Sequence, residues 1–545
     1  MKKSIVYEIM ETKSSMYLSQ FRLWLCFIIT TLVSLSSSTR WYDDHISLKE
    51  IHAEETFHFP KNFLFGTASS AYQYEGAYLT DGKTLSNWDV FTNISGKIAD
   101  GSHGKVAVDH YHRYPGDLDL MEDLGVNSYR LSLSWARILP KGRFGDVNMG
   151  GIDHYNRMIN DILKRGIEPF VTLTHYDIPQ ELEYRYGSWL NPQIREDFEH
   201  YANICFRHFG DRVKFWSTFN EPNVQVILGY RTGTYPPSRC SKTFGNCSCG
   251  DSYIEPLVAA HNIIRSHVAA VNLYRTKFQE QQRGQIGIVM NTIWFEPISD
   301  SLADRLAADR AQAFYLTWFL DPVVFGRYPR EMREILGDDL PEFTKDDLKS
   351  SKNALDFIGI NQYTSRYAKD CLHSVCEPGK GGSRAEGFVY ANALKDGLHL
   401  GEPTGVNWLS VYPQGMEEML MYATERYKNI PLYVTENGFG ENNTGVLLND
   451  YQRVKFMSNY LDALKRAMRK GADVRGYFAW SLLDNFEWIS GYTIRFGMYH
   501  VDFSTQERTP RLSASWYKNF IFQHRALSKD DWCLKQKEDT NFFLI

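Results

Sequence analysis

The chain has 545 residues, of which 43% are hydrophobic, 14% aromatic and 23% charged. This composition excludes an intrinsically disordered chain and a membrane protein with many spanning segments. Lys and Arg number 60 and Asp and Glu number 65, so the formal net charge is −5 and no basic excess favours a nucleic-acid partner. The many aromatic rings fit either a packed core or the binding of sugar faces.

Residues 1–40 have the pattern of a secretory leader. The apolar run over residues 23–33 is too short to span a bilayer, follows several basic residues and precedes a run of small residues. We therefore predict a leader over residues 1–40 and an N-terminal extension over residues 41–58, with an N-terminal membrane anchor as the alternative. No later segment is long and apolar enough to span a membrane, so we expect no membrane partner once the leader is removed.

Three Asn-x-Ser/Thr sequons fit passage through the secretory pathway. They make Asn93, Asn246 and Asn442 candidate glycosylation sites. We expect the chain to reach the cell wall or another extracellular location, with the vacuole as the alternative destination.

Most of the cysteines gather in two loops rich in glycine and serine. Cys240, Cys247 and Cys249 lie in the first loop, and Cys371 and Cys376 lie in the second. In an oxidising compartment we expect short disulfides that hold these exposed loops. The Cys-Ser-Cys spacing does not match the Cys-x-x-Cys of a zinc or redox site.

Short apolar runs alternate with amphipathic, helix-like segments along the chain. Apolar strands that recur between helices indicate parallel strands covered on their outer face, and eight of them favour a closed (β/α)8 barrel. We predict one barrel domain with extended βα loops over residues 59–525, followed by a C-terminal tail over residues 526–545. The runs are 63–66, 128–134, 169–174, 213–219, 285–291, 357–361, 432–435 and 475–481. The helical segments include 151–165, 194–209, 253–276, 304–320, 415–426 and 450–469.

Polar residues lie where these runs end. In a (β/α)8 barrel the catalytic groups lie at the carboxyl ends of the strands. Glu221 and Glu436 each directly follow an apolar run, and only a closed fold could bring them together. The other polar or aromatic residues at these ends are Gln73, Arg130, His175, Asn220, Asn361, Tyr363, Asn437, Trp480, Glu487 and Trp488.

Two carboxyl groups are what the cleavage of a glycosidic bond requires. One protonates the leaving oxygen, and the other meets the developing oxocarbenium ion, at about 5–5.5 Å for retention or about 6.5–9.5 Å for inversion. If Arg130 reaches Glu436, we expect it to lower the pKa of that carboxyl and keep it ionised. Tyr363 could donate a hydrogen bond to the same group. The alternative is that both glutamates only serve the dipoles of helix N-termini.

Four motifs in the same order resemble those of family 1 glycoside hydrolases, the retaining β-glucosidases. They are Thr-Phe-Asn-Glu-Pro at 218–222, Val-Thr-Glu-Asn-Gly at 434–438, the N-terminal signature at 65–76 and the sugar-binding segment at 480–488. The resemblance runs from about residue 59 to residue 522. It implies that Glu221 is the acid/base and Glu436 the nucleophile.

The same resemblance implies roles for other residues of the site. It implies that Tyr363 orients the nucleophile, that Trp408 is an aromatic platform for the aglycone, and that Cys240 and Cys247 form a disulfide. Cys371 and Cys376 are a second possible pair. The glucose hydroxyls would be held by Gln73, His175, Asn220, Glu487 and Trp488, with Trp480 and Phe496 lining the same pocket.

Two positions depart from the family pattern. His175-Tyr176-Asp177 stands where His-Trp-Asp is usual, and Gln362 stands where a Tyr is common. With the second cysteine pair and the loop at 378–382, these departures resemble the plant subgroup associated with coniferin-type monolignol glucosides.

The sequence therefore predicts a secreted, retaining β-glucosidase that acts on small glucosides with aromatic aglycones and needs no cofactor. One alternative is a glucosyltransferase on the same fold, and another is a sugar-binding protein that has lost catalysis. We expect no metal site, because His110 and His112, two positions apart, would point away from each other on a helix. The oligomeric state is not predicted.

Overall fold

The computed structural model describes residues 59–350, 354–428, 430–442 and 447–525. For residues 348–350 it describes the backbone only. The predicted leader, the N-terminal extension and the C-terminal tail lie outside the described residues. The described residues belong to one compact unit, which begins at Phe59. Within it, no helix has both the length and the apolar character needed to cross a membrane.

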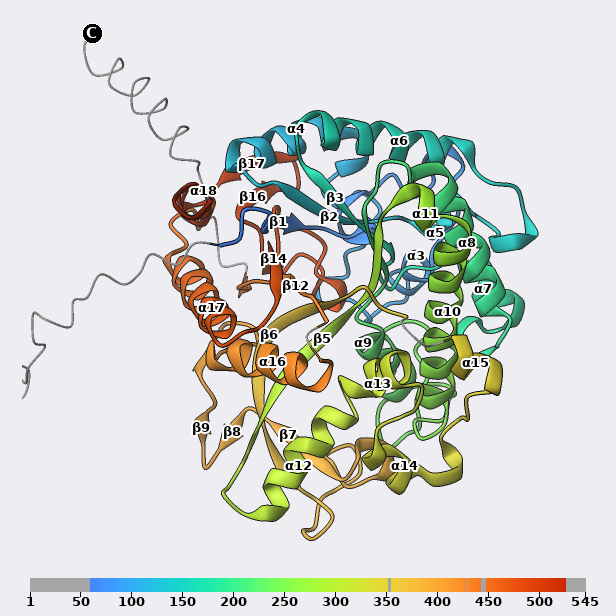
Figure 1. Cartoon of the computed structure of the whole chain (residues 1–545), viewed down its shortest axis with the longest axis vertical. Coiled ribbons are helices and arrows are strands. Elements are labelled where there is room, and N and C mark those ends of the chain that lie inside the picture. Colours follow the sequence, from blue (N-terminus) through green and yellow to red (C-terminus); the bar gives the residue numbers. More distant parts are fainter. Residues whose placement is uncertain (1–58, 351–353, 429, 443–446, 526–545) are drawn as a thin grey trace, which may run out of the picture. The chain divides into compact units, whose positions relative to one another are not determined.

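Eight parallel strands form a closed ring (Figure 1), which confirms the predicted (β/α)8 barrel. Each strand pairs with the next, β6 pairs with β12, and β14 returns to pair with β1. The ring consists of β1 (Leu64–Ala68), β2 (Ser128–Ser132), β3 (Glu168–Thr174), β4 (Phe215–Asn220), β5 (Gln285–Pro297), β6 (Phe357–Asp370), β12 (Leu432–Asn437) and β14 (Val474–Ala479).

Helices cover the outer face of the ring (Figure 1), and an amphipathic helix such as α6 (Met149–Lys164) buries one apolar stripe. On α6, for example, Ile152, Tyr155 and Ile159 are all buried. The main helices are α4 (His110–Leu124), α6 (Met149–Lys164), α8 (Ile194–Phe209), α10 (Glu255–Lys277), α12 (Leu302–Ala313), α13 (Thr317–Phe325), α16 (Gln414–Arg426), α17 (Tyr451–Arg469) and α18 (Leu512–His524).

Three predicted elements differ from those observed. The single helix expected over 304–320 is two helices, α12 and α13, and the turn between them lets the Tyr315 hydroxyl reach Asn291 at 2.6 Å. Strands β5 and β6 run for 13 and 14 residues, well beyond their apolar cores. The extension carries β6 past the barrel rim, where it pairs antiparallel with β7 (Val389–Asn392).

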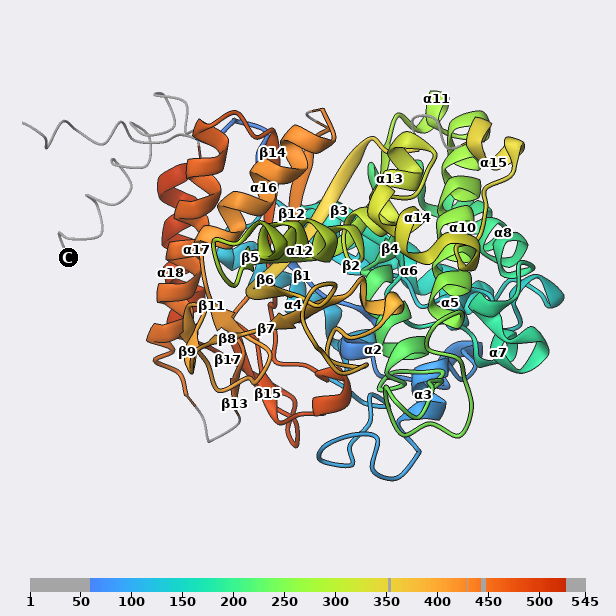
Figure 2. The same ribbon diagram turned by 90° about the horizontal axis from the view of Figure 1, so that it is seen from below.

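The long βα loops gather at one end of the barrel. Figure 2 shows the hairpin of β8 (Leu394–Lys395) and β9 (Leu398–His399) on this side of the ring strands, together with the antiparallel pair of β13 (Glu441–Asn442) and β15 (Ile494–Arg495). Disulfides join Cys240 to Cys247 and Cys371 to Cys376, the two pairs that were expected.

Aromatic rings fill the interior of the barrel at the other end. Phe170 on β3 contacts Phe215, Phe357, Tyr433 and Phe478, with ring centroids between 5.2 and 5.6 Å apart. Glycines make room for these rings, since a Cβ on Gly66 would approach the Phe478 ring to 2.4 Å. Because the interior is packed here, the loop-bearing mouth is the end where a substrate could enter.

The first and last described elements pack against each other. The Phe59 ring lies 5.0 Å from Phe65 on β1 and 6.3 Å from Phe520 on α18. The Tyr517 hydroxyl of the same helix donates to the Gly66 carbonyl at 3.1 Å, across 451 positions of sequence. Helix α18 therefore covers the outside of the strand that begins the ring.

Candidate active site

Glu221 lies at the carboxyl end of β4, where the chain turns into the short helix α9 (Pro222–Val226). Its backbone has a positive φ of 43°, and the residue is 7% exposed. Oε1 accepts hydrogen bonds from Nδ2 of Asn361 at 2.8 Å and of Asn291 at 2.9 Å, and Oε2 accepts one from the Tyr176 hydroxyl. Glu221 is the N-cap residue of α9, but its side chain makes no capping hydrogen bond to this helix.

Glu436 lies inside β12 and is 4% exposed. Its Oε1 accepts from Nη1 of Arg130 at 2.5 Å, and its Oε2 accepts from the Tyr363 hydroxyl at 2.8 Å. Because Glu436 is in a strand, the helix-dipole alternative is wrong for this glutamate, whereas Glu221 does lie at a helix N-terminus. Both predicted contacts of this carboxyl are present.

The expected lowering of the Glu436 pKa is wrong. Burial raises the pKa of this carboxyl to about 7, with a further rise from the nearby negative charge of Glu221. Arg130 and the Tyr363 hydroxyl oppose the rise but do not overcome it. The sequence identified the cation correctly, but it could not give the cost of removing the carboxylate from water.

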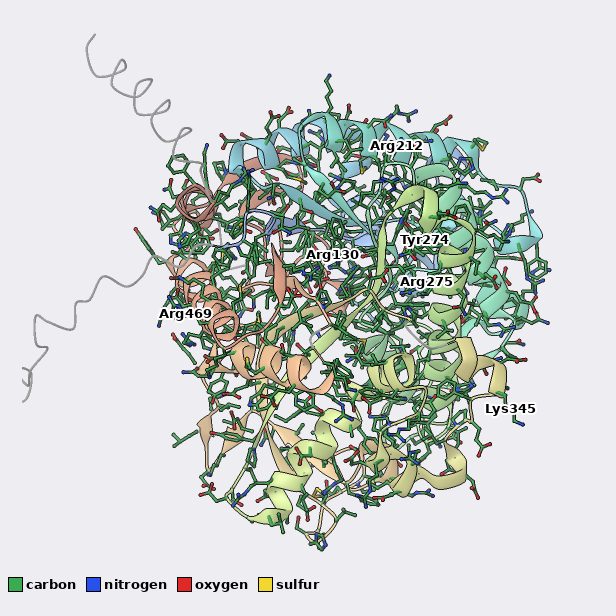
Figure 3. The ribbon with its side chains drawn as sticks, viewed as in Figure 1. Arg130, Arg212, Tyr274, Arg275, Lys345 and Arg469 are labelled. Atoms are coloured by element: carbon green, nitrogen blue, oxygen red, sulfur yellow. A yellow bond between two sulfur atoms is a disulfide. The ribbon has the colours of Figure 1, made fainter. Side chains whose placement is uncertain are left out.

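A continuous chain of hydrogen bonds joins the two carboxyl groups. Arg130 donates to Glu436 and, through Nη2, to the Asn220 amide oxygen at 2.7 Å. Nδ2 of Asn361 donates to the same Asn220 oxygen at 3.0 Å and to Glu221 at 2.8 Å. In Figure 3, Arg130 is labelled near the centre of the strand ring, whereas Arg469 lies on the outer layer. The structure therefore places both glutamates in one network.

His175 follows β3 and belongs to this network. Burial and the positive charge of Arg130 hold the pKa of His175 well below its usual value, so the imidazole is neutral. Its Nε2 accepts from the Asn220 amide at 3.0 Å, which places the ring hydrogen on Nδ1. Nδ1 is buried with no hydrogen-bond partner among the residues described, and it is therefore free to donate to a ligand.

The segment after β14 contributes the third carboxyl group. Burial raises the pKa of Glu487 to about 8, and the negative charges of Glu436 and Glu221 add to this effect. Trp480 and Trp488 stack nearly parallel to the His175 ring, with centroids 6.1 and 5.9 Å away. Three residues expected to hold or surround glucose therefore lie beside the two catalytic candidates.

Gln73 is fully buried and its amide hydrogens are already used. Nε2 donates to the Asn485 amide oxygen at 3.0 Å and to the Phe486 carbonyl at 2.9 Å, while Oε1 accepts from the Ser70 hydroxyl at 2.7 Å. A contact of Gln73 with a sugar hydroxyl stays a prediction, and it depends on the second lone pair of Oε1.

An aromatic wall leads outward from Tyr363. The Tyr363 ring lies 5.7 Å from Trp408 and 6.1 Å from Phe496, and the Trp408 and Phe496 rings are nearly parallel. Phe496 is buried, whereas Trp408 is 42% exposed. A large exposed ring next to a catalytic carboxyl group is available to stack on a bound molecule, so the platform role of Trp408 stays a prediction with a suitable geometry.

Three residues that hold Glu221 in place had no role predicted from the sequence. Tyr176 was noted only as a departure from the family pattern, yet its hydroxyl contacts the carboxylate directly. Asn291 ends the fifth apolar run, so the expectation that functional groups lie at the carboxyl ends of the strands could have identified it. Tyr315, which donates to the Asn291 oxygen, gave no signal because it follows a helix.

No cluster of three or more His, Cys, Asp or Glu side chains suited to a metal ion is present in the described ranges. His110 bonds to Asp117 at 2.8 Å and His112 bonds to Asp109 at 2.6 Å, so the two rings engage different carboxylates.

Three sequence relatives resemble this chain over most of its length. It is 97% identical over all 545 residues to beta-glucosidase 47 of Arabidopsis thaliana, with 100% of each chain covered. It is 52% identical to the probable inactive beta-glucosidase 14 of Oryza sativa subsp. japonica, covering 87% of this chain and 93% of the relative. It is 49% identical to the coniferin beta-glucosidase of Pinus contorta, covering 86% and 92%.

Solved structures and the family profile agree with these relatives. A mutant of the rice β-glucosidase Os3BGlu6, in a covalent complex with Glc from GA4GE, matches with a TM-score of 0.82 and 46% identity over 84% of this chain and 98% of that one. Residues 55–526 match the sequence model of the family described as Glycosyl hydrolase family 1. The chain therefore belongs to glycosyl hydrolase family 1 and is a β-glucosidase.

Proposed function

We propose that this β-glucosidase hydrolyses small glucosides with aromatic aglycones, monolignol glucosides such as coniferin among them, in two steps with retention at the anomeric carbon. The main support is the contrast between the surroundings of the two glutamates. Glu436 contacts Arg130 and the Tyr363 hydroxyl, whereas Glu221 contacts two neutral amides and a phenol.

In the first step the Glu436 carboxylate attacks the anomeric carbon. Arg130 favours its ionised form, and Tyr363 directs its second oxygen. Glu221 donates its proton to the glycosidic oxygen, and the aglycone leaves as an alcohol. In the second step Glu221 takes a proton from water, and the resulting hydroxide displaces Glu436 and releases glucose. The covalent Glc complex of the rice relative supports an intermediate of this kind.

The aglycone assignment rests on the wall beyond Tyr363. Trp408 offers an exposed aromatic face, and the 49% identical pine relative is named for coniferin. We further propose secretion with glycans on Asn93, Asn246 and Asn442, whose side chains are all exposed. A catalytically lost protein has less support, although one relative is named probable inactive, because both glutamates and their partners are in place here.

Azide rescue tests the roles of the two glutamates. Glu436→Gly is expected to abolish turnover of an activated aryl β-glucoside, and added azide is expected to restore it and to give the α-glucosyl azide. Glu221→Gly is expected to give the β-glucosyl azide, because the azide then attacks the glucosyl-enzyme. Product stereochemistry is read by NMR. Normal turnover in Glu436→Gly without azide would contradict the assignment.

A substrate screen tests the aglycone. We expect kcat/KM to be higher for coniferin and syringin than for cellobiose, since a second sugar stacks less well on an exposed indole than a phenyl ring does. In Trp408→Ala this preference is expected to shrink, with little change for a glucoside of a small alcohol. Equal loss on every substrate would show that Trp408 does not act on the aglycone.

A further inference from the structure

The hydroxyl of Tyr176 lies against the carboxyl group that donates the proton. Tyr176 follows His175 at the end of β3 and is 3% exposed, and its hydroxyl donates to Oε2 of Glu221. The other oxygen, Oε1, accepts from the amides of Asn291 and Asn361. Each carboxyl oxygen of Glu221 thus has its own set of donors.

The separate hydrogen-bond donors of Oε1 and Oε2 decide which oxygen of Glu221 carries the proton. A carboxyl oxygen has two lone pairs, and two N–H groups occupy both of those on Oε1. When Glu221 is protonated, its hydrogen is therefore on Oε2, the oxygen that Tyr176 contacts. Oε2 is the atom that gives its proton to the glycosidic oxygen.

We propose that Tyr176 is a positioning residue for the acid/base, whose hydroxyl stabilises Oε2 as it loses its proton and so promotes departure of poor leaving groups. This inference rests on the proposed function of Glu221. In the step, the O–H bond of Glu221 breaks and a new O–H bond forms on the aglycone oxygen. That oxygen keeps the electron pair of the glycosidic bond, and Glu436 forms the new bond to the anomeric carbon. Tyr176 keeps its own hydrogen throughout.

The surroundings hold Tyr176 in the geometry that this role requires. Nδ2 of Asn87 donates to the Tyr176 carbonyl at 3.1 Å, and the residue has a positive φ of 71°. Its ring packs against Trp488 and Tyr235, with centroids 5.0 and 5.8 Å away. Burial and the charge of Glu221 raise the pKa of the phenol well above its usual value, so the group stays protonated and can donate.

The position also departs from the family pattern, in which a Trp is usual. A phenol and an indole differ in the direction and reach of their single donor. The contact with Oε2 therefore depends on the residue type found in this chain, and substitution can remove it with little change in volume.

A comparison of two substrates tests the proposal. Phenyl β-D-glucoside needs its leaving oxygen protonated, whereas 2,4-dinitrophenyl β-D-glucoside does not. In Tyr176→Phe, kcat/KM for the phenyl glucoside is expected to fall about 10- to 100-fold, the range for one hydrogen bond to a charged group. For the dinitrophenyl glucoside the change is expected to stay below about 3-fold on the same reasoning. Tyr176→Trp, a second variant should Tyr176→Phe fold poorly, is expected to show the same selective loss.

Two controls make the outcome clear. Tyr235→Phe removes the hydroxyl of the tyrosine that packs on Tyr176, and it is expected to keep the wild-type ratio of the two rates. The ratio within one variant is independent of how much of the preparation is folded. Equal losses on both substrates in Tyr176→Phe, or no loss on either, would overturn the inference.

The Glu221→Gln variant separates this inference from the proposed function. If it hydrolyses phenyl glucoside at the wild-type rate, the acid/base assignment fails and the inference fails with it. If it loses that activity and keeps turnover of the dinitrophenyl glucoside to the glucosyl-enzyme stage, the assignment holds. An unchanged rate ratio in Tyr176→Phe would then overturn only the role of Tyr176.

Discussion

Three glutamates of the site carry charges that repel one another. The charges of Glu221 and Glu436 both raise the pKa of Glu487, in addition to the effect of its burial, and Glu221 also raises the pKa of Glu436. A carboxyl group whose pKa is higher in the folded than in the unfolded chain lowers the stability of the fold as the pH rises between those two values. The close placement of these three carboxyl groups therefore destabilises the empty enzyme at neutral pH.

Removing one of these charges is expected to stabilise the protein. Glu487 has a pKa of about 8 in the folded chain against a usual value of 4.5. Its ionisation therefore lowers the free energy of unfolding, an effect that is absent below about pH 4.5 and complete above about pH 8. In Glu487→Gln, Tm is expected to exceed that of the wild type by an amount that grows between pH 5 and pH 8, to about 2 °C. Thermal unfolding of both proteins across that range gives the measurement.

The matched control for this prediction is Glu418→Gln on α16, which removes an exposed glutamate. Its Tm difference from the wild type is expected to be independent of pH. A constant difference for Glu487→Gln as well would mean that Glu487 does not titrate between those pH values in the folded enzyme.

At the scale of elements, one buried ion pair fixes the segment that carries Trp480, Glu487 and Trp488. Asp484 is fully buried in this segment and accepts from both terminal nitrogens of Arg511 at 2.8 Å. Arg511 directly precedes α18, so the pair ties the segment over residues 480–488 to the last helix that the structure describes.

Breaking this pair is expected to be costly. Arg511→Met leaves the buried carboxylate with one longer ion pair, to Arg495 at 3.2 Å, and with the backbone N–H groups of Gly497 and Val501, so the free energy of unfolding should fall by about 3–5 kcal/mol. Urea unfolding followed by fluorescence measures the change. Arg475→Met is the control, since the side chains of its pair with Asp473 are 42% and 38% exposed and the pair should be worth less than about 1 kcal/mol. Similar losses in both variants would show that burial of the pair does not set its value.

At the scale of the whole molecule, the barrel was predictable because each ring strand has a short apolar core that recurs between helices. The expectation that catalytic groups lie at the carboxyl ends of the strands also placed Glu221, Glu436 and His175 in one site. The long outer parts of β5 and β6 could not be predicted, because beyond the apolar runs these strands mix polar, aromatic and aliphatic residues without a clear period of two. The Tyr176 contact was not predictable either, since it depends on a turn with positive φ that sequence periodicity does not reveal.

The packing of α18 on β1 has a consequence for how the chain is made. The ribosome releases β1 long before the strand's second neighbour, β14, and before its covering helix, whose Tyr517 follows Gly66 by 451 positions. During translation the nascent sheet therefore has an open edge and uncovered aromatic rings, which other chains could bind. A premature stop codon ahead of α18 would consequently yield an aggregating fragment and not a weakened enzyme.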